Sequence, residues 1–435
     1  MIFSEVTLQR NQLAQAVVQT LAVLGGEPVA TSRDTRQWPI LTKADYEAVE
    51  RVLNRGVLSG RVAPEIRALE KEFAAYVGVH TCLATNSGTA ALHMALAAAG
   101  VGPGDEVIVP ALTFIATAQA VLHQGATPVF ADIDRITYNL DPARVADHIT
   151  PRTKAVIPVH LHGLPAEMDP INTLADRWGL TVIEDAAQAH GASYGGRQAG
   201  RLGHMAAFSL NSTKNLPAGE GGLFVTDSPE LAAKAARFRF NGVNPDPGWD
   251  PDRPLDGKSD SLAGTRGYMY LPTELTAALA RSQLTRLGLT TERSRENAAR
   301  LAARLAKLAG LETPVVPADT THVFHKYRVR LDPVGAGVNV PSIEFRDLVL
   351  HALRAEGVEA VIWQSSPIPF HPLFGSSEQF PEAQAALDAS FIIGSQSFPL
   401  FAQPTSVVDA WADAFEKVWA NLDLLIASGL TEEGR

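Results

Sequence analysis

The chain has 435 residues, of which 46% are hydrophobic and 19% are charged, and its formal net charge at pH 7 is −10. No stretch approaches 18 uninterrupted apolar residues, so the sequence predicts no membrane span. It also lacks a cluster of Lys and Arg interleaved with aromatic residues, the electrostatic feature of a nucleic-acid binder. We therefore expect a soluble protein whose partners are small molecules.

Cysteine usage and the N-terminal residues both favour a cytoplasmic protein. Cys82 is the only cysteine, which excludes an intrachain disulfide and any multi-cysteine metal site. The N-terminus has no compact apolar run after a basic start, and Glu5 comes early, so a secretory signal is not predicted. We expect residues 1–37 to form an extension that packs on the body of the protein or on a partner subunit.

Seven short apolar runs, rich in β-branched residues, recur in the first half of the chain. They are 82–85, 106–110, 127–132, 155–160, 181–186, 205–210 and 222–227. Stretches of helical composition separate the first five, and their continuous apolar character is typical of parallel strands buried on both faces. The last two are joined by a Gly-containing segment, so one of them runs antiparallel or the crossover is abbreviated. The predicted class is α/β, with a mostly parallel seven-stranded sheet.

The second half of the chain predicts a loop, a helix and a smaller domain. Residues 243–260 are dense in Pro, Asp and Gly, which indicates a surface loop that we expect to be mobile. From residue 273 on, the spacing of Leu275, Leu279 and Leu287 predicts one long amphipathic helix that leads into a C-terminal α+β domain. Since 435 residues exceed one typical domain, we expect a large domain over 38–285 and a small one over 286–435.

A first chemical motif, NSGTAAL at residues 86–92, lies between the first strand and an Ala-rich helix. Ser87 and Thr89 offer hydroxyl groups, and Gly88 lets the backbone come close to a ligand. The start of the helix presents unpaired N–H groups and the positive end of its dipole to an anion. An ordinary helix N-cap has the same composition, so this motif alone fits phosphate binding and simple capping about equally well.

A second motif, IEDAAQAHG at residues 183–191, places an acidic pair at the end of an apolar strand. Open α/β sheets bind ligands at this carboxyl edge. A carboxylate buried there needs a cationic partner, and a protonated pyridine nitrogen is such a partner. Strand alternation sends Glu184 and Asp185 to opposite faces, and we assign Asp185 to the ligand. The alternative is that Asp185 only caps a helix.

A third motif, FSLNSTKNLPAGEGG at residues 208–222, leads from a strand into a lysine and a Gly-rich turn. Partial burial of Lys214 near another cation would lower its pKa and give the neutral amine that Schiff-base chemistry requires. An exposed loop lysine is the alternative.

The order and spacing of these three motifs resemble the DegT/DnrJ/EryC1/StrS family of sugar and cyclitol aminotransferases. The resemblance covers most of residues 38–290, and the C-terminal third matches more loosely at HKYRVR and PIPFHPLF. It implies the fold of aspartate aminotransferase, which is fold type I, and the cofactor pyridoxal 5′-phosphate (PLP).

The resemblance also implies roles for individual residues. Lys214 would form the Schiff base with PLP and act as general acid and base, and Asp185 would keep the pyridine nitrogen protonated. Gln188 would contact the phenolic oxygen or the ring face, and Phe114 would stack on the ring. The residues implied to bind the phosphate are Ser87, Gly88, Thr89, Ser209 and, from a neighbouring subunit, Asn241. A homodimer with shared active sites would follow.

The expected reaction moves an amino group from glutamine or glutamate to a keto sugar or keto cyclitol, in secondary-metabolite or cell-surface sugar biosynthesis, with ping-pong kinetics. The sequence has GYMYL at residues 267–271 where many relatives read GYNYR, which leaves the acceptor open. The alternatives are a PLP-dependent sugar dehydratase, against which Lys214 argues, and a catalytically silent binding or regulatory member. A Rossmann-type oxidoreductase would need a Gly-x-Gly-x-x-Gly after the first strand, which is missing. His160 and His162 could suggest a metal pair, but packing or pocket lining explains them better.

Overall fold

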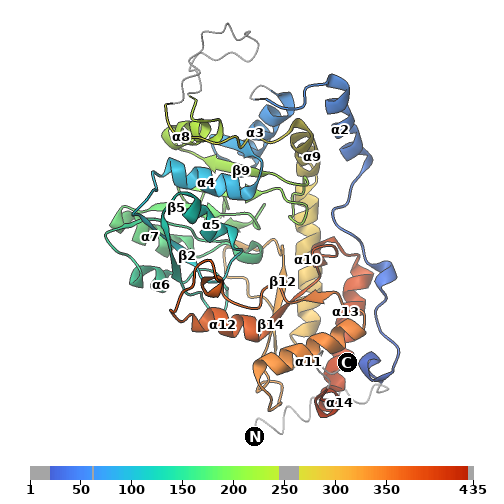
Figure 1. Ribbon diagram of the computed structural model, residues 1–435. Coiled ribbons are helices and arrows are strands. Elements are labelled where there is room, and N and C mark those ends of the chain that lie inside the picture. The colour runs from blue at the N-terminus through green and yellow to red at the C-terminus, as the bar shows by residue number, and fades with distance from the viewer. Residues whose placement is uncertain (1–19, 61–62, 244–263, 430–435) are drawn as a thin grey trace. The chain divides into compact units, whose positions relative to one another are not determined.

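The computed structural model of the protein describes residues 20–60, 63–243 and 264–429 (Figure 1). These residues form two compact units. The larger comprises Leu41–Leu289 and Val316–Val323, and the smaller comprises the residues before Leu41, Thr290–Val315 and those from Phe324 on. The loop predicted at 243–260 lies, except for Val243, outside the described residues.

The larger unit is built on a seven-stranded sheet, and all seven predicted strands are present in it. Their order is β1-β9-β8-β5-β4-β2-β3. Only β9 runs against its neighbours, because it pairs antiparallel with both β1 and β8, so the predicted reversal falls on the last strand. The bounds are β1 Thr81–Thr85, β2 Glu106–Pro110, β3 Thr127–Ala131, β4 Thr153–Val156, β5 Thr181–Asp185, β8 Met205–Ser209 and β9 Gly222–Thr226. The fourth strand ends earlier than predicted, before Pro158, whose ring leaves no N–H for the ladder.

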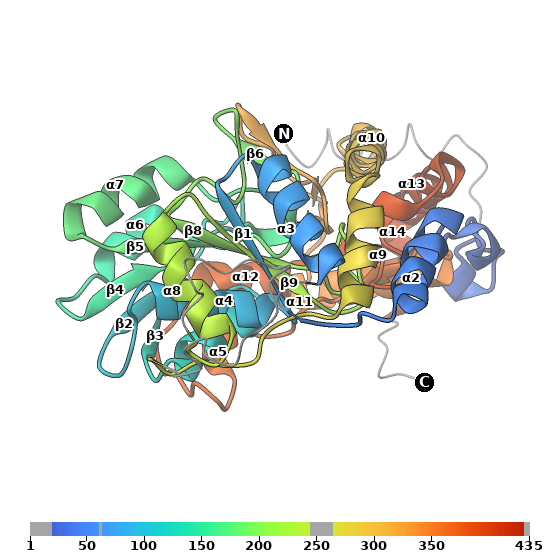
Figure 2. The same cartoon turned by 90° about the horizontal axis from the view of Figure 1, so that it is seen from above.

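Helices cover this sheet and bury it. Strands β2, β8 and β9 are buried along their whole length, as expected where both faces are covered. Helix α4 packs along β8 and β9 and lies beside α8, while α3 packs on β1 (Figure 2). The helices of the larger unit are α2 Lys43–Arg55, α3 Pro64–Val77, α4 Gly88–Ala98, α5 Ala116–His123, α6 Pro142–Asp147, η3 Leu161–Gly163, α7 Met168–Trp178, α8 Pro229–Arg239 and α9 Glu274–Leu284. A second, small sheet joins β6 Ser193–Tyr194, β7 Arg197–Gln198 and β11 Thr320–Thr321.

The prediction of one long helix from residue 273 on is wrong, because the structure has two helices there. Helix α9 ends at Leu284 and α10 runs over Leu287–Leu305. The Thr285 hydroxyl donates to the Ser282 carbonyl at 2.7 Å, and such local bonds compete with the helical ladder. The Arg286 guanidinium binds Asp45 at 2.8 Å, which fixes the interruption from outside the helix.

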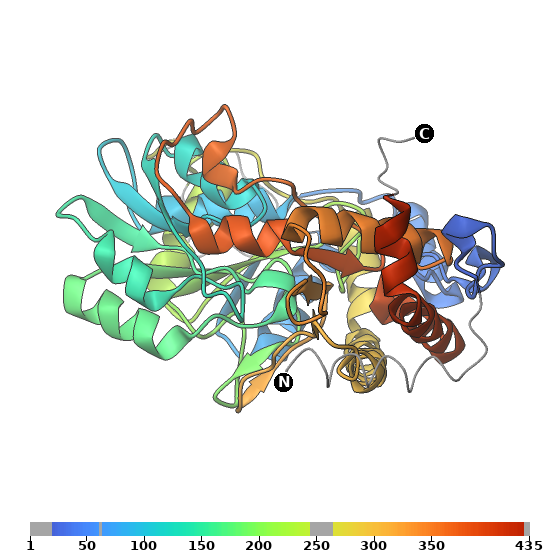
Figure 3. The same cartoon turned by 90° about the horizontal axis from the view of Figure 1, so that it is seen from below.

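The smaller unit packs helices on an antiparallel sheet of order β10-β12-β14-β13, drawn in orange and red in Figure 3. Its strands are β10 Leu311–Glu312, β12 Tyr327–Leu331, β13 Ala360–Val361 and β14 Ser390–Ile393. Its other helices are η1 Ala22–Leu24, η2 Ser32–Asp34, α11 Ser342–Ala355, η4 Ile368–Phe370, α12 Pro381–Asp388, η5 Leu400–Ala402, α13 Thr405–Ala420 and α14 Leu422–Ser428. Trp411 and Phe415 of α13 and Phe391 of β14 lie in its core.

The described part of the predicted N-terminal extension packs on this smaller unit. The buried carboxylate of Glu356 accepts hydrogen bonds from the backbone N–H of Ala22 at 2.7 Å and of Val29 at 3.1 Å. The same carboxylate forms an ion pair with Lys417 at 2.9 Å, so its charge has a cationic partner. Across the described ranges, none of the helices has the length and apolar character needed to cross a membrane.

Candidate active site

The three motifs meet at one edge of the large sheet. Strands β1, β5 and β8 end there, and the antiparallel β9 begins there, with Gly222 paired to both Thr85 and Ser209. A Cβ added to Gly222 would lie 2.3 Å from the carbonyl oxygen of Ser87, and one added to Gly88 would lie 2.9 Å from Cβ of Ser209. The chain segments therefore approach one another so closely that only glycine fits at these two positions.

The start of α4 leaves hydrogen-bond donors at this edge. Ser87 is the N-cap, and its side-chain oxygen accepts from the backbone N–H of Ala90 at 3.1 Å. The first N–H groups of a helix have no intrahelical acceptor, so those of Gly88 and Thr89 are available to a ligand. Together with the positive end of the helix dipole they form a site suited to phosphate.

Asp185 is the last residue of β5 and is buried. Its Oδ2 accepts from the Thr117 hydroxyl at 2.7 Å, and its Oδ1 accepts from the Ala187 N–H at 3.2 Å. Burial raises the pKa of the Asp185 carboxyl, while the Thr117 and Ala187 bonds and the nearby Lys214 act in the opposite direction. A cation that approached this carboxylate would therefore be bound strongly.

Glu184, one residue earlier, has different partners and a different role. It is fully buried, and its Oε2 lies 2.8 Å from Nε2 of His160. The other His160 nitrogen, Nδ1, accepts from the Ala166 N–H at 3.1 Å, so the proton of a neutral imidazole lies on Nε2 and points to Glu184. The remaining donors to Glu184 are the backbone N–H groups of Gly200, Leu202 and Gly203, at 2.7 to 2.8 Å. Both oxygens of Glu184 therefore already accept two hydrogen bonds each from the protein, which leaves Asp185 as the carboxylate available to a ligand.

Lys214 lies close enough to Asp185 that each changes the pKa of the other. Burial lowers the pKa of Lys214 to about 8, and the carboxylates of Asp185 and Glu220 oppose this effect. The lowering was predicted from partial burial beside another cation; it is present, and burial causes it without a second cation. A substantial fraction of Lys214 is a neutral amine near pH 8, as nucleophilic attack on a carbonyl requires.

Three other predicted residues lie in the segments next to Asp185, Lys214 and Thr117. Gln188 is buried, and its Oε1 accepts from the His162 N–H at 2.9 Å, which directs its NH2 group away from that contact. Ser209 ends β8, and its hydroxyl accepts from the Asn211 N–H at 3.3 Å. Phe114 is 56% exposed and lies just before α5, where its carbonyl accepts from the Thr117 N–H at 3.1 Å.

Asn241 is the predicted residue that the described part of this chain does not connect to the others. It is exposed, has a φ of 52°, and its N–H donates to the Tyr268 carbonyl at 3.0 Å. Its predicted role belongs to a neighbouring subunit, and it stays a prediction.

Two features of the site had no role assigned from the sequence. One is the pair Thr113 and Thr117, whose i, i+4 spacing after a strand end was the available signal. The other is His190, which is buried beside the rings of Phe73 and Phe208. Burial, with a smaller effect of Lys214, lowers the pKa of His190 to about 3, so it is neutral in the working range of most enzymes. Among the described residues, no group of three or more His, Cys, Asp or Glu could hold a metal ion.

The group fits PLP in charge and reactivity. The start of α4 matches a phosphate, Asp185 matches a protonated ring nitrogen, and the lowered pKa of Lys214 matches an aldehyde-reactive amine. The fold and the proteins that resemble it define a fold type I, PLP-dependent aminotransferase.

The chain matches the DegT/DnrJ/EryC1/StrS aminotransferase family over residues 39–403 and belongs to this family. It is 38% identical over 380 residues to the spore coat polysaccharide biosynthesis protein SpsC of Bacillus subtilis, covering 87% of this chain and 95% of that protein. It is 43% identical over 306 residues to GDP-perosamine synthase of Caulobacter vibrioides, covering 70% and 76%. The crystal structure of S. venezuelae DesV in complex with a ketimine intermediate has a TM-score of 0.76 and 35% identity, covering 89% of this chain and 99% of that one. The resemblance found in the sequence is thereby confirmed.

Proposed function

We propose that the protein uses PLP, held at Lys214, to transfer an amino group from glutamine or glutamate to the keto group of a nucleotide-linked sugar. The observation that carries the proposal is the meeting of Lys214, Asp185 and the start of α4 at one sheet edge. The similarity to GDP-perosamine synthase and to a polysaccharide biosynthesis protein favours a sugar acceptor over a cyclitol. We further propose that the enzyme works in the cytoplasm as a homodimer in which Asn241 reaches the partner's cofactor phosphate.

The residues of this chain would divide the work as follows. Gly88 and Thr89 at the start of α4 would hold the phosphate with their N–H groups, with the Ser87 and Ser209 hydroxyls close by. Asp185 would hold the proton on the ring nitrogen, since its buried carboxylate is stabilised by a positive charge. When bound, the cofactor supplies an electron sink for the pair released when a proton leaves the substrate carbon.

Other side chains would position the cofactor and move the proton. The NH2 group of Gln188 would donate to the phenolic oxygen, because the amide oxygen is already bonded to His162. Phe114 would cover the exposed ring face. Nζ of Lys214 would take the proton from the carbon of the amino donor and later return it to the carbon of the acceptor, so one base serves both halves of the reaction.

The test is the visible absorbance of the purified protein with PLP, before and after glutamine or glutamate is added, for the wild type, Lys214→Ala and Lys234→Ala. Lys234 is a surface residue on α8, 48% exposed, and is the matched control. We expect a visible band in the wild type and in Lys234→Ala that is lost when the donor is added, and no lysine-dependent band in Lys214→Ala. A wild type that never forms the band would contradict the proposal.

The acceptor is identified by mass spectrometry of the products from nucleotide-linked keto sugars and free keto cyclitols. Replacement of the keto oxygen by an amino group would support the aminotransferase, whereas loss of a hydroxyl would identify a dehydratase. A protein that binds PLP but consumes no donor would be a binding or regulatory member of the family.

A further inference from the structure

We infer that Thr117 is a positioning residue, which holds Asp185 in its charged form and aims it at the ring nitrogen of the cofactor. The inference rests on the proposed function and concerns a residue that the motif analysis did not assign. It starts from the contact between the Thr117 hydroxyl and Oδ2 of Asp185, at 2.7 Å, between residues that are 68 positions apart in the sequence.

Thr117 is the side-chain hydrogen-bond donor that the described part of the chain supplies to Asp185. The other donor is the backbone N–H of Ala187, at the longer distance of 3.2 Å. Each carboxylate oxygen therefore has one donor from the protein and keeps capacity for another. The arrangement fixes the orientation of the carboxylate without using all of its acceptor sites.

A second hydroxyl, that of Thr113, extends this bond into a chain of two. Oγ1 of Thr113 lies 3.1 Å from Oγ1 of Thr117, and both residues are fully buried. A hydroxyl has one proton, and an ionised carboxylate can only accept, so the Thr117 proton points to Asp185. The Thr113 proton then points to Thr117. Two hydroxyls in line polarise each other and strengthen the terminal bond to the carboxylate.

The charge on Asp185 depends on this chain of hydroxyls. Burial favours the protonated carboxyl, and the hydrogen bond from Thr117 is the largest of the effects that oppose burial. A protonated Asp185 would lose its ability to attract a protonated ring nitrogen. Thr117 therefore has a task that packing alone does not require, namely keeping a desolvated carboxylate ionised while its ligand is absent.

The same turn of chain also carries Phe114. The Thr117 N–H donates to the Phe114 carbonyl at 3.1 Å, so the start of α5 joins the residue that orients Asp185 to the aromatic residue expected on the ring. A change at Thr117 that moved α5 would therefore disturb the ring face as well as the carboxylate. The experiment has to separate these two effects.

To separate an effect on the carboxylate from an effect on the ring face, the experiment compares two ligands. They are PLP and its 1-deaza analogue, in which a C–H group replaces the ring nitrogen. Both have the aldehyde and the phosphate, but only PLP offers a nitrogen to Asp185. Dissociation constants of both for the apoprotein are measured by fluorescence titration for Thr117→Val, Thr117→Ser, Thr113→Val and Thr226→Val. Thr226 is the matched control, because it is a buried threonine whose hydroxyl bonds to the His204 carbonyl at the other end of β9.

We expect Thr117→Val to weaken PLP by about tenfold, as for loss of a hydrogen bond to a charged group, and the deaza analogue by less than about twofold. Thr113→Val should weaken PLP by roughly threefold, because it acts through Thr117. Thr117→Ser keeps the hydroxyl and should bind both ligands like the wild type, as should Thr226→Val. The serine variant also covers the case in which the valine variant does not fold.

The outcomes separate this inference from the proposed function. If Thr117→Val weakens both ligands equally, or neither, Thr117 only packs, and the inference is overturned while the proposed function stands. A wild type that binds both ligands equally well would contradict the assignment of Asp185 to the ring nitrogen and the role of Thr117 with it. A wild type that forms no covalent complex with either ligand would overturn the proposed function itself.

Discussion

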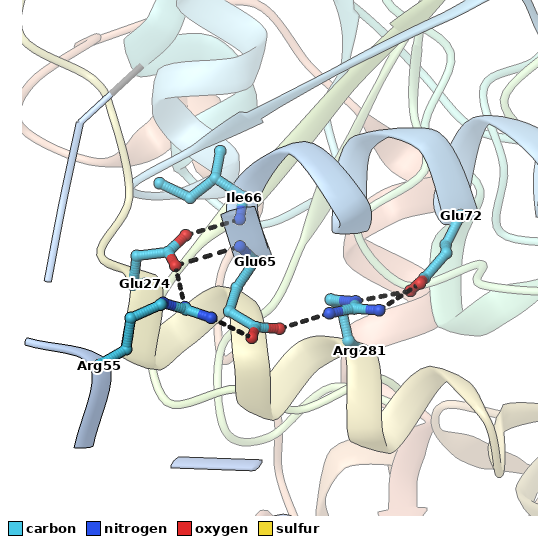
Figure 4. Close-up of polar contacts among 6 residues, drawn as sticks. All are labelled: Arg55, Glu65, Ile66, Glu72, Glu274 and Arg281. Atoms are coloured by element: carbon cyan, nitrogen blue, oxygen red, sulfur yellow. Dashed lines mark hydrogen bonds and ion pairs between the residues drawn. The ribbon is translucent and has the colours of Figure 1, made fainter. Parts of the chain in front are cut away.

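Two of the places where the larger unit buries carboxylates differ in how they neutralise the charge. Where α2, α3 and α9 meet, Glu274 is fully buried and accepts from Arg55 at 2.6 Å and from the backbone N–H groups of Glu65 and Ile66 (Figure 4). Glu65 in turn binds Arg281, which also binds Glu72. Every carboxylate in this cluster has a guanidinium group, which stays charged at all ordinary pH values.

Asp185 has no such permanent cation. Its donors are a hydroxyl and one backbone N–H, and the nearby Lys214 has a lowered pKa of about 8. The comparison teaches that the carboxylates of this cluster receive their positive partners from the protein, whereas the place beside Asp185 is suited to a cationic ligand. This difference should appear when Asp185 and Glu274 are each replaced by the corresponding amide.

Asp185→Asn should have the largest effect on activity and little effect on folding. The amide keeps the size of the side chain but cannot hold a proton on the ring nitrogen, so kcat of the donor half-reaction should fall by about 10³-fold. The raised pKa of Asp185 means that its ionised form disfavours the folded state above that pKa, so the amide should cost no more than about 1 kcal/mol of stability. Single-turnover kinetics and urea unfolding measure the two effects. A large loss of stability with intact kinetics would contradict the comparison.

Glu274→Gln should show the opposite pattern. Loss of the charge removes the shorter of the two ion pairs that the described residues give Arg55, which keeps Glu65 at 3.3 Å, and weakens the bonds to the start of α3. The free energy of unfolding should therefore fall by about 3 kcal/mol. Urea unfolding measures it, beside Glu230→Gln as a control. Glu230 forms an exposed i, i+4 ion pair with Lys234, and its replacement should cause no measurable change. PLP affinity of the folded Glu274→Gln protein should equal that of the wild type.

Much of the fold was predictable because it depends on local pattern. The seven strands follow from short β-branched runs. The short connection between the last two predicted either an antiparallel strand or an abbreviated crossover, and the first of these is present. The break between α9 and α10 was not predictable. The apolar pattern continues through it, and the bond from Arg286 to Asp45 joins residues 241 positions apart.

The candidate site divides in the same way. Lys214 and Asp185 lie within recognisable motifs, and the structure brings them together. The i, i+4 spacing of Thr113 and Thr117 could mark these two residues, but Asp185 lies 68 positions from Thr117, so no local pattern could link the pair to this carboxylate. The lowered pKa of Lys214 was predicted from partial burial beside another cation; burial is its main cause, and no cation is among the other causes.

The pH dependence of the reaction of PLP with the apoprotein tests Lys214, the group near Asp185 that becomes cationic at low pH. The neutral fraction of Lys214 should rise about tenfold per pH unit below pH 8 and level off above it, since the pKa is about 8. Stopped-flow absorbance of the apoprotein mixed with PLP should follow this curve. The carboxylate of Glu220 raises the pKa of Lys214, so Glu220→Gln should move the curve to lower pH. A rate that keeps rising beyond pH 10 would indicate an ordinary, exposed lysine.

The prediction with the smallest expected effect compares two serine N-caps, of which only one lies at the predicted phosphate site. Ser87 caps α4 and Ser228 caps α8, with bonds to Ala90 at 3.1 Å and to Leu231 at 3.3 Å. Either serine replaced by alanine should lower the free energy of unfolding by about 1 kcal/mol, because each leaves one N–H without its acceptor. Only Ser87→Ala should also weaken PLP, by about threefold, because only α4 starts at the predicted phosphate site. Urea unfolding measures the stability of both variants, and titration with PLP measures their affinities for the cofactor. If Ser87→Ala binds PLP as tightly as Ser228→Ala, the phosphate is held elsewhere.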